Sequence, residues 1–261
     1  MLLHLLPVIL ALSTKPLFCE AVVDKSATPS VLGTFNASFI IGEVPAELAY
    51  SLLPAKYRDS KAILPPDSAK FPGIKDGMLP ILLELGRETN SGPPGLQIEN
   101  FQEAKIRVPN VKLDSSSPFI YSRLIATDVD LIAQGSKYQF GLNASVETFV
   151  PANSNEAQDY NYIVKNVVEV RLSEVAESSL RYPVSTYEFL RTLPWFGDKE
   201  GDCAQHFYDA SSALVKRLSG QATLYPPLAG KSDSPVSFAI EAIHGVYNYV
   251  IVGPQACKNF I

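Results

Sequence analysis

YNYIVKNVVEVRL, residues 160–172, alternates in a way that predicts a β-strand. Every second position from Tyr160 is mostly tyrosine, valine or leucine, whereas the positions between include asparagine, lysine, glutamate and arginine. A period of two residues is typical of a strand with one face in water. Similar runs occur at 34–43, 79–86, 101–108, 119–126, 138–150, 220–226, 235–243 and 246–252. So many strands predict a closed or nearly closed antiparallel sheet.

Helix signals are few. Asp202 as N-cap, Gln205 three residues later and Gly220 as the stop predict one long amphipathic helix. Residues 45–53 predict a shorter helix that ends at Pro54. The fold class is therefore mainly β (α+β), with one long and one short helix. At 261 residues and 46% hydrophobic residues, the chain can form one domain with a sizeable core.

The first residues predict a signal peptide. Leu2 to Leu12 is a short apolar stretch, and residues 19–21 suit cleavage after Ala21, which leaves a single domain over residues 22–261. The stretch is too short to span a bilayer core of about 30 Å. A buried N-terminal strand is the alternative.

Two further features fit export. Asn36 and Asn143 each begin an Asn-Ala-Ser glycosylation acceptor. Cleavage removes Cys19, and we expect Cys203 and Cys257 to pair in an oxidising compartment, although two unrelated buried thiols are the alternative. The predicted location is the secretory pathway, with the protein secreted, vacuolar or associated with the cell wall.

Charge and motifs exclude several functions. A net charge of −5 with a pI near 5.3 gives no footprint for nucleic acid, and no basic run suggests a membrane surface. The sequence has no nucleophile elbow, phosphate loop, dinucleotide fingerprint or metal-ligand spacing, so no cofactor or metal is expected. His206 and His244 could each be a general base, but a lone histidine is more often a surface or core residue.

A longer pattern resembles a known family. The runs 100–109 and 119–141 resemble the central segment of the acetoacetate decarboxylase family, and 36–54, 78–86, 220–225 and 235–241 resemble its opening, its next strand and its closing hairpin. Together these pieces cover about residues 31–255. The resemblance implies a cone-shaped antiparallel β-barrel that encloses a small molecule.

The sequence departs from this family at its reactive position. In the decarboxylases one lysine forms a Schiff base with a β-keto acid, and a cationic neighbour keeps that lysine unprotonated. The matching stretch here is Leu142-Asn143-Ala144-Ser145, and an asparagine amide cannot form an imine. The sequence therefore predicts a chamber that has lost its reactive amine, with Leu82, Tyr138 and Asn143 contacting the ligand.

One acid is retained. Glu84 matches the family's first pocket glutamate, and alternation places it on the same interior face as Leu82 and Gly86. Glu103 or Glu99 corresponds to the second glutamate. An apolar chamber should raise the pKa of Glu84, which suits a general acid or base. An exposed charge at a strand end is the alternative.

Three functions remain open. The first is an acid/base enzyme (isomerase, dehydratase or cyclase, hence an isomerase or lyase) acting without a Schiff base on a small oxygenated or polyketide-derived metabolite. The second is a non-catalytic carrier. The third is a decarboxylase with a relocated lysine, Lys137 or Lys105. A lysine ammonium in the chamber within reach of Glu84 would contradict the premise of the first.

Overall fold

The computed structural model describes residues 30–58, 61–113, 117–153, 160–199, 201–209 and 215–261. The predicted signal peptide, residues 1–21, lies outside this set. Three α-helices occur in the described part: α1 (Ala46–Ser51), α2 (Asp130–Phe140) and α3 (Val184–Thr192). Short 3₁₀ turns occur at η1 (Ala55–Tyr57), η2 (Glu177–Ser179) and η3 (Cys257–Phe260). No helix of the described residues is both long and apolar enough to cross a membrane.

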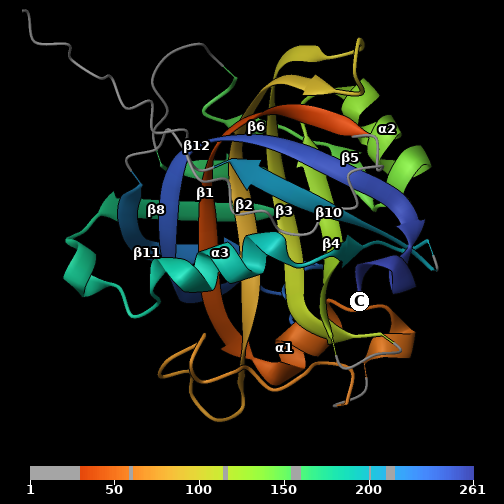
Figure 1. The fold of residues 1–261 in the computed structure, drawn as a ribbon. Helices are drawn as coiled ribbons and strands as arrows, with labels where there is room; N and C mark the ends of the chain where they lie inside the picture. Colours follow the sequence, from red (N-terminus) through yellow and green to blue (C-terminus); the bar gives the residue numbers. More distant parts are fainter. Residues whose placement is uncertain (1–29, 59–60, 114–116, 154–159, 200, 210–214) are drawn as a thin grey trace, which may run out of the picture.

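The described strands form one sheet (Figure 1). They are β1 (Val31–Pro45), β2 (Met78–Gly92), β3 (Ile98–Lys112), β4 (Pro118–Thr127), β5 (Ala144–Val146), β6 (Phe149–Val150), β7 (Tyr162–Val164), β8 (Val168–Glu174), β9 (Trp195–Phe196), β10 (Asp202–Asp209), β11 (Lys216–Leu224) and β12 (Val236–Ala256).

Seven of these strands close a ring. The order is β1-β2-β3-β4-β9-β10-β12, and β12 pairs again with β1. Each neighbouring pair in the ring is antiparallel except β4 with β9, which is parallel. The prediction of a mainly β, antiparallel barrel is confirmed.

The long strand β12 joins the ring to a second layer. Its first half pairs with β11, and the layer continues through β8, β7 and β6. Its second half pairs with β10. Strands β1 to β4 therefore have two buried faces: an inner face toward the ring interior, and an outer face that packs against α1, β8 and β11.

Aromatic contacts identify the inner face. The ring of Phe39 on β1 meets Tyr208 on β10 with centroids 5.2 Å apart, although these two strands are not neighbours. Such contacts across the ring are possible only for side chains that point inward. Helix α3 also packs on this cluster through Tyr187 and Leu190.

The predicted long helix is wrong. Residues 202–209 form β10, because both edges of this segment pair with other strands, β9 and β12. Such pairing satisfies the backbone groups that a helix would have satisfied internally. Residues 216–224 form β11, whereas residues 210–214 lie outside the described set. The short helix is confirmed at Ala46–Ser51.

The strand prediction for 138–150 is confirmed only at β5 and β6 and is wrong for its first residues. Its first residues lie in α2, an 11-residue helix that begins at Asp130 and ends before Gly141. Asp130 places a negative charge in the first turn, Lys137 places a positive charge in the last, and Gly141 has φ 65°. These start and stop signals are visible in the sequence.

Two further strand boundaries differ. The run 160–172 is a hairpin, because Asn166 adopts φ 61° and turns the chain between β7 and β8. Conversely, 235–243 and 246–252 are one continuous strand, β12, because Gly245 pairs with Ala37 without interrupting the ladder.

Candidate active site

The ring interior contains a cavity of about 180 Å³. Its apolar wall includes Phe101, Ile125, Phe140, Leu142, Trp195 and Ile251. Its polar wall includes Glu88, Ser91, Glu103, Lys105, Arg107, His206 and Tyr249. The volume is close to the roughly 150 Å³ that accommodates one benzene molecule. An apolar cavity with a few converging polar groups is the usual form of a small-molecule site.

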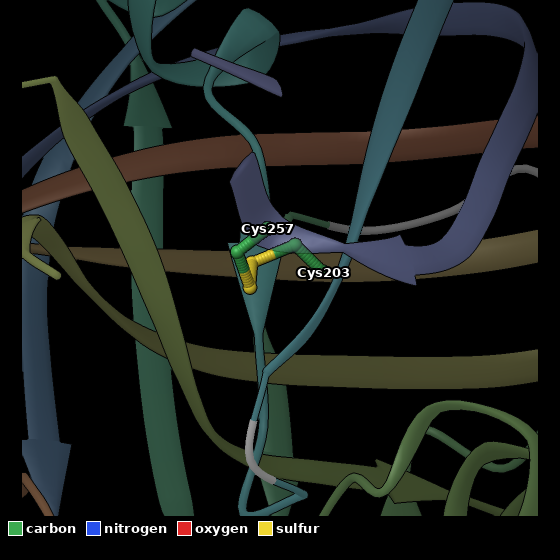
Figure 2. Close-up of a disulfide and its surroundings, with 2 residues drawn as sticks. All are labelled: Cys203 and Cys257. Carbon is green, nitrogen blue, oxygen red and sulfur yellow. A yellow bond between two sulfur atoms is a disulfide. The ribbon is translucent and has the colours of Figure 1, made fainter. Parts of the chain in front are cut away.

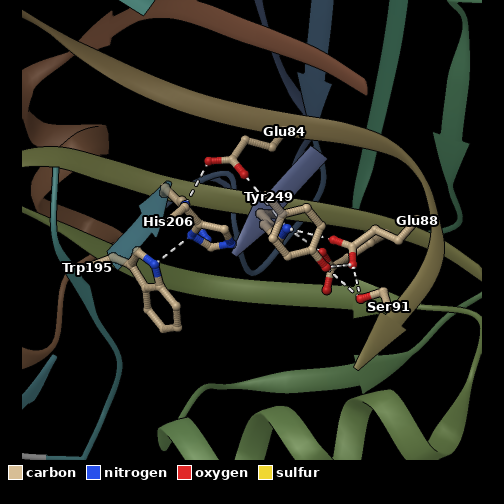
Figure 3. A network of polar contacts seen from close by, with 9 residues as sticks. Glu84, Glu88, Ser91, Trp195, His206 and Tyr249 are labelled. Atoms are coloured by element: carbon tan, nitrogen blue, oxygen red, sulfur yellow. Dashed lines mark hydrogen bonds and ion pairs between the residues drawn. The ribbon is translucent and has the colours of Figure 1, made fainter. Parts of the chain in front are cut away.

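Within the polar wall, side chains of β2 and β3 form a buried ion cluster (Figure 3). Lys105 Nζ lies 3.1 Å from Glu88 Oε1 and 3.8 Å from Glu84 Oε2, and it also pairs with Glu103. Arg107 Nη1 donates to Glu84 Oε1 at 2.8 Å. The register pairs Glu84 directly with Lys105, and a period of two keeps the charges of each strand on one face.

Glu88 and Glu103 have opposite protonation preferences. Burial would raise the pKa of Glu88, but the Lys105 ammonium and hydrogen bonds hold it below its ordinary value. Ser91 Oγ donates to Glu88 Oε2 at 2.7 Å, and Tyr249 Oη donates to the same oxygen. Burial and the Glu88 charge raise the pKa of Glu103 well above its ordinary value, although Lys105 acts against them. The surroundings therefore separate the two pKa values, and Glu103 is the member of the pair that more readily retains a proton.

Lys105 is held as an ammonium ion. Burial alone would lower its pKa, but the carboxyl groups of Glu103 and Glu88 more than offset this and raise the pKa above its ordinary value. When Glu103 is protonated, the carboxylates of Glu84 and Glu88 balance the cations of Lys105 and Arg107. The cluster then has no net charge, which allows it to remain buried.

His206 is a neutral imidazole. Burial lowers its pKa well below the ordinary value, and the charges of Lys105 and Arg107 lower it further. Trp195 Nε1 donates to His206 Nδ1 at 2.7 Å, so the proton of the neutral ring is on Nε2 (Figure 3). The ring also stacks on Tyr208, with centroids 5.3 Å apart.

Arg107, one of the residues that line the cavity, has unused donors. Its Nε and Nη2 are buried and make no hydrogen bond with the residues that the structure describes. The guanidinium also lies 5.5 Å from the ring centroid of Trp195. Because buried N–H groups are normally paired, an oxygen atom of a ligand is a suitable acceptor here.

The structure brings together only some of the predicted site residues. Leu82 and Glu84 are on the inner face, 1% exposed each, but neither lines the cavity. Glu84 lies behind the cations and is their counter-ion. Glu103 is the predicted acid that does line the cavity.

Three predicted placements need correction. Glu99 is exposed near the start of β3 and does not line the cavity. Tyr138 is 83% exposed on α2, so it does not contact the cavity. Asn143 is exposed after that helix, and its side chain donates to the Arg123 carbonyl oxygen at 3.2 Å. This stretch meets the cavity through Phe140 and Leu142 instead.

The prediction that the chamber has lost its amine is also wrong. Lys105 lines the cavity, 3% exposed and within reach of Glu84. Lys137, by contrast, is exposed on α2. Non-covalent chemistry therefore cannot be inferred from the absence of a lysine, and the charge state of Lys105 becomes the deciding property.

Several functional residues were missed from the sequence. Glu88 and Arg107 continue the period-two series that Glu84 and Lys105 begin, so alternation could have found them. Ser91 follows Glu88 on β2, whereas Trp195 and Tyr249 reach the cavity only through the closure of the ring. His206, which the sequence offered as a possible base, also lines the cavity. His244 lies elsewhere, and its Nδ1 is 3.0 Å from Ser38 Oγ in a buried pair.

The predicted disulfide between Cys203 and Cys257 is confirmed (Figure 2). It joins the start of β10 to η3, which follows β12, and its Cα atoms are 4.8 Å apart. It therefore anchors β10, the strand that carries His206, rather than a helix.

Among the described residues, no group of three or more His, Cys, Asp or Glu side chains is arranged to hold a metal ion.

The barrel and its second layer have an acetoacetate decarboxylase-like fold. The enduracididine biosynthesis enzyme MppR complexed with pyruvate superposes with a TM-score of 0.50 and 14% identity, over 96% of this chain and 97% of that chain. An acetoacetate decarboxylase gives 0.49 and 7% identity over 87% and 88%. The acetoacetate decarboxylase of Legionella pneumophila gives 0.45 and 14% over 86% and 87%. No sequence-family model matches the chain, and no curated protein is similar to it in sequence.

Proposed function

We propose that the protein is an enzyme that transfers protons on a small oxygenated molecule bound in the cavity, without a covalent intermediate. The observation that carries this proposal is the acid pair at the cavity surface: Glu88 and Glu103 both line the cavity and contact Lys105, and their surroundings shift their pKa values in opposite directions. Two carboxyl groups with separated pKa values are the usual arrangement for acid/base chemistry.

Glu103 is the group that exchanges protons with the substrate. Glu88 is less suitable, because Ser91, Tyr249 and Lys105 already donate to it. In an isomerisation Glu103 delivers a proton to one atom and its carboxylate accepts one from another. In a dehydration its proton joins the leaving hydroxyl group, which departs as water, and the resulting Glu103 carboxylate takes a proton from the adjacent carbon as the C=C bond forms. Both sequences conserve protons.

The neighbouring donors stabilise charge on the substrate oxygen. The unused N–H groups of Arg107 lie at the same wall as Glu103, and the neutral His206 carries its proton on Nε2. Preorganised donors in a cavity screened from water stabilise a developing enolate or alkoxide. The small volume and apolar wall suit a compact ketone, aldehyde or polyketide-derived metabolite.

Exchange of carbon-bound hydrogen tests the proposal without the natural substrate. The protein is incubated with 2-pentanone in D₂O, and deuterium incorporation beside the carbonyl is followed by NMR. We expect exchange above the buffer rate, and Glu103→Gln should reduce it by about 100-fold or more. Glu99→Gln is the matched control, because Glu99 is on the same strand but exposed. Equal rates for Glu103→Gln and wild type would contradict the role of Glu103.

A Schiff base on Lys105 is the second candidate, because this lysine lines the cavity. The three carboxyl groups around it favour the ammonium form, which is not nucleophilic. We therefore expect no adduct when borohydride is added with pyruvate or acetoacetate and the intact mass is measured. A reduced adduct that disappears in Lys105→Arg would replace the acid/base proposal with imine chemistry.

A carrier would behave differently from both enzymes. It would bind 2-pentanone in calorimetry, but it would show no exchange and no borohydride adduct. Glu103→Gln would then leave the affinity within a few-fold of wild type. That combination would contradict both catalytic mechanisms.

We also propose that the protein enters the secretory pathway. Support comes from the disulfide and from the exposed side chain of Asn143, which a glycan could reach. The second acceptor, Asn36, is half-buried within β1 and suits a glycan less well. Treatment of the natural protein with a deglycosidase should lower its mass at Asn143. An unmodified chain that starts at Met1 would refute this localisation.

A further inference from the structure

The cavity has a polar deep end and an apolar mouth. Glu103, Lys105 and Arg107 are 5%, 3% and 3% exposed, whereas Leu96 and Leu131 are 65% and 55% exposed and also line the cavity. The two leucines come from different elements: Leu96 lies in the loop between β2 and β3, and Leu131 lies in the first turn of α2. Large apolar side chains exposed at the rim of a pocket often indicate a binding surface.

From this gradient we infer that the ligand is an amphipathic carbonyl compound, with its oxygen at Arg107 and a hydrocarbon chain that leaves between Leu96 and Leu131. The inference rests on the proposed function for its head group and goes beyond it in naming the substrate class. Ile98, Ile125 and Ile251 line the path between the two ends.

The head group should be uncharged. Three carboxyl groups already surround the two cations of the cluster, so a further carboxylate would be buried without a cationic partner. The buried N–H groups of Arg107 need an acceptor rather than a counter-ion, because Nη1 of the same side chain already binds Glu84. A ketone or aldehyde oxygen satisfies both conditions.

The cavity volume limits how much of the ligand's hydrocarbon chain is enclosed. A cavity of about 180 Å³ accommodates only a few more atoms than benzene. Longer chains must therefore continue past the mouth, where the exposed leucines cover one side of the chain and water the other.

Calorimetry with 2-alkanones from 2-butanone to 2-nonanone tests the inference. Each added carbon should lower Kd by about fourfold while it enters the cavity, which corresponds to about 0.8 kcal/mol per buried methylene. The gain should become smaller once the chain passes the mouth. n-Alkanoates of equal length should bind at least tenfold more weakly. A Kd that does not change with chain length, or equal binding of alkanoates, would overturn the inference.

Three variants and one control locate the hydrocarbon chain of the ligand. Leu96→Ser and Leu131→Ser should weaken 2-nonanone several-fold and leave 2-butanone unchanged, whereas Tyr138→Ser, exposed on the same helix as Leu131, should change neither. Gly135→Leu should weaken the long ketones tenfold or more, because Gly135 lines the cavity and a side chain there meets no atom within 4 Å. Unchanged long-chain binding in all three would place the tail elsewhere and overturn the inference.

Parallel titrations of Glu103→Gln separate this inference from the proposed function. We expect this variant to lose hydrogen exchange but to retain the dependence on chain length. Chain-length dependence without exchange in the wild type would overturn the catalytic role alone. Exchange without chain-length dependence would overturn the apolar exit alone.

Discussion

The two faces of β2 and β3 are both buried, yet one is apolar and the other is charged. Leu83 and Ile106 pack on the outer face in the larger hydrophobic core. Glu84 follows Leu83 on β2, and Lys105 precedes Ile106 on β3. Both charged side chains point into the ring and are 1% and 3% exposed. Successive side chains thus alternate between two buried faces, and only the inner face carries groups that can take part in a reaction. Buried charges of this kind are costly, and they are retained chiefly where they have a use.

The largest loss of stability is expected when the buried ion pair between Arg107 and Glu84 is removed. Arg107→Met removes the partner that lies 2.8 Å from Glu84 and leaves this carboxylate buried. We expect the free energy of unfolding to fall by about 3–5 kcal/mol, measured by urea denaturation at pH 7. The double variant Glu84→Gln/Arg107→Met should recover part of that loss. A loss below about 1 kcal/mol would mean that water reaches the inner face.

The outer face should respond through packing instead. Ile106→Ala creates a cavity in the apolar core, where Ile106 is 1% exposed, and should cost about 2–5 kcal/mol by the same measurement. This loss should be independent of pH, since no titrating group is removed. Hydrogen exchange of 2-pentanone by the folded variant should remain close to the wild-type rate. A large change in exchange would show that the two faces are not functionally separate.

The acid pair on the inner face should give stability a pH dependence that the outer face lacks. The folded state raises the pKa of Glu103, so the native protein retains a proton that the unfolded chain releases above about pH 4.3. This contribution is fully present below that pH and is lost as pH rises toward the folded pKa.

Urea denaturation between pH 4 and 8 measures the effect. Relative to Glu103→Gln, wild-type stability should decline with rising pH by up to about 1.4 kcal/mol per unit. Parallel curves for the two proteins would mean that Glu103 ionises normally in the fold. A relative increase of wild-type stability with pH would mean that the Lys105 ammonium holds it ionised.

The sequence predicts the strands of this wall better than it predicts their surroundings. Alternation in residues 79–86 and 101–108 locates β2 and β3, because side-chain direction in a strand is a local property. It cannot tell which face meets water, since Lys105 and Arg107 would also suit a solvated face. The sequence offered His206 as a possible base but placed it on a helix, because its strand, β10, is defined by pairing with β9 and β12 rather than by its own residues.

A surface ion pair provides the smallest test of the comparison. Lys231 Nζ lies 2.8 Å from Glu47 Oε1, the same distance as Arg107 from Glu84, but these side chains are 84% and 74% exposed. Water and salt screen such a pair, and little is lost when both ends return to solvent. Lys231→Ala should therefore leave the urea midpoint unchanged within error at 0.15 M salt. A clear decrease in the urea midpoint would show that distance, and not burial, determines how much an ion pair stabilises this fold. Burial would then not explain a larger effect at Arg107.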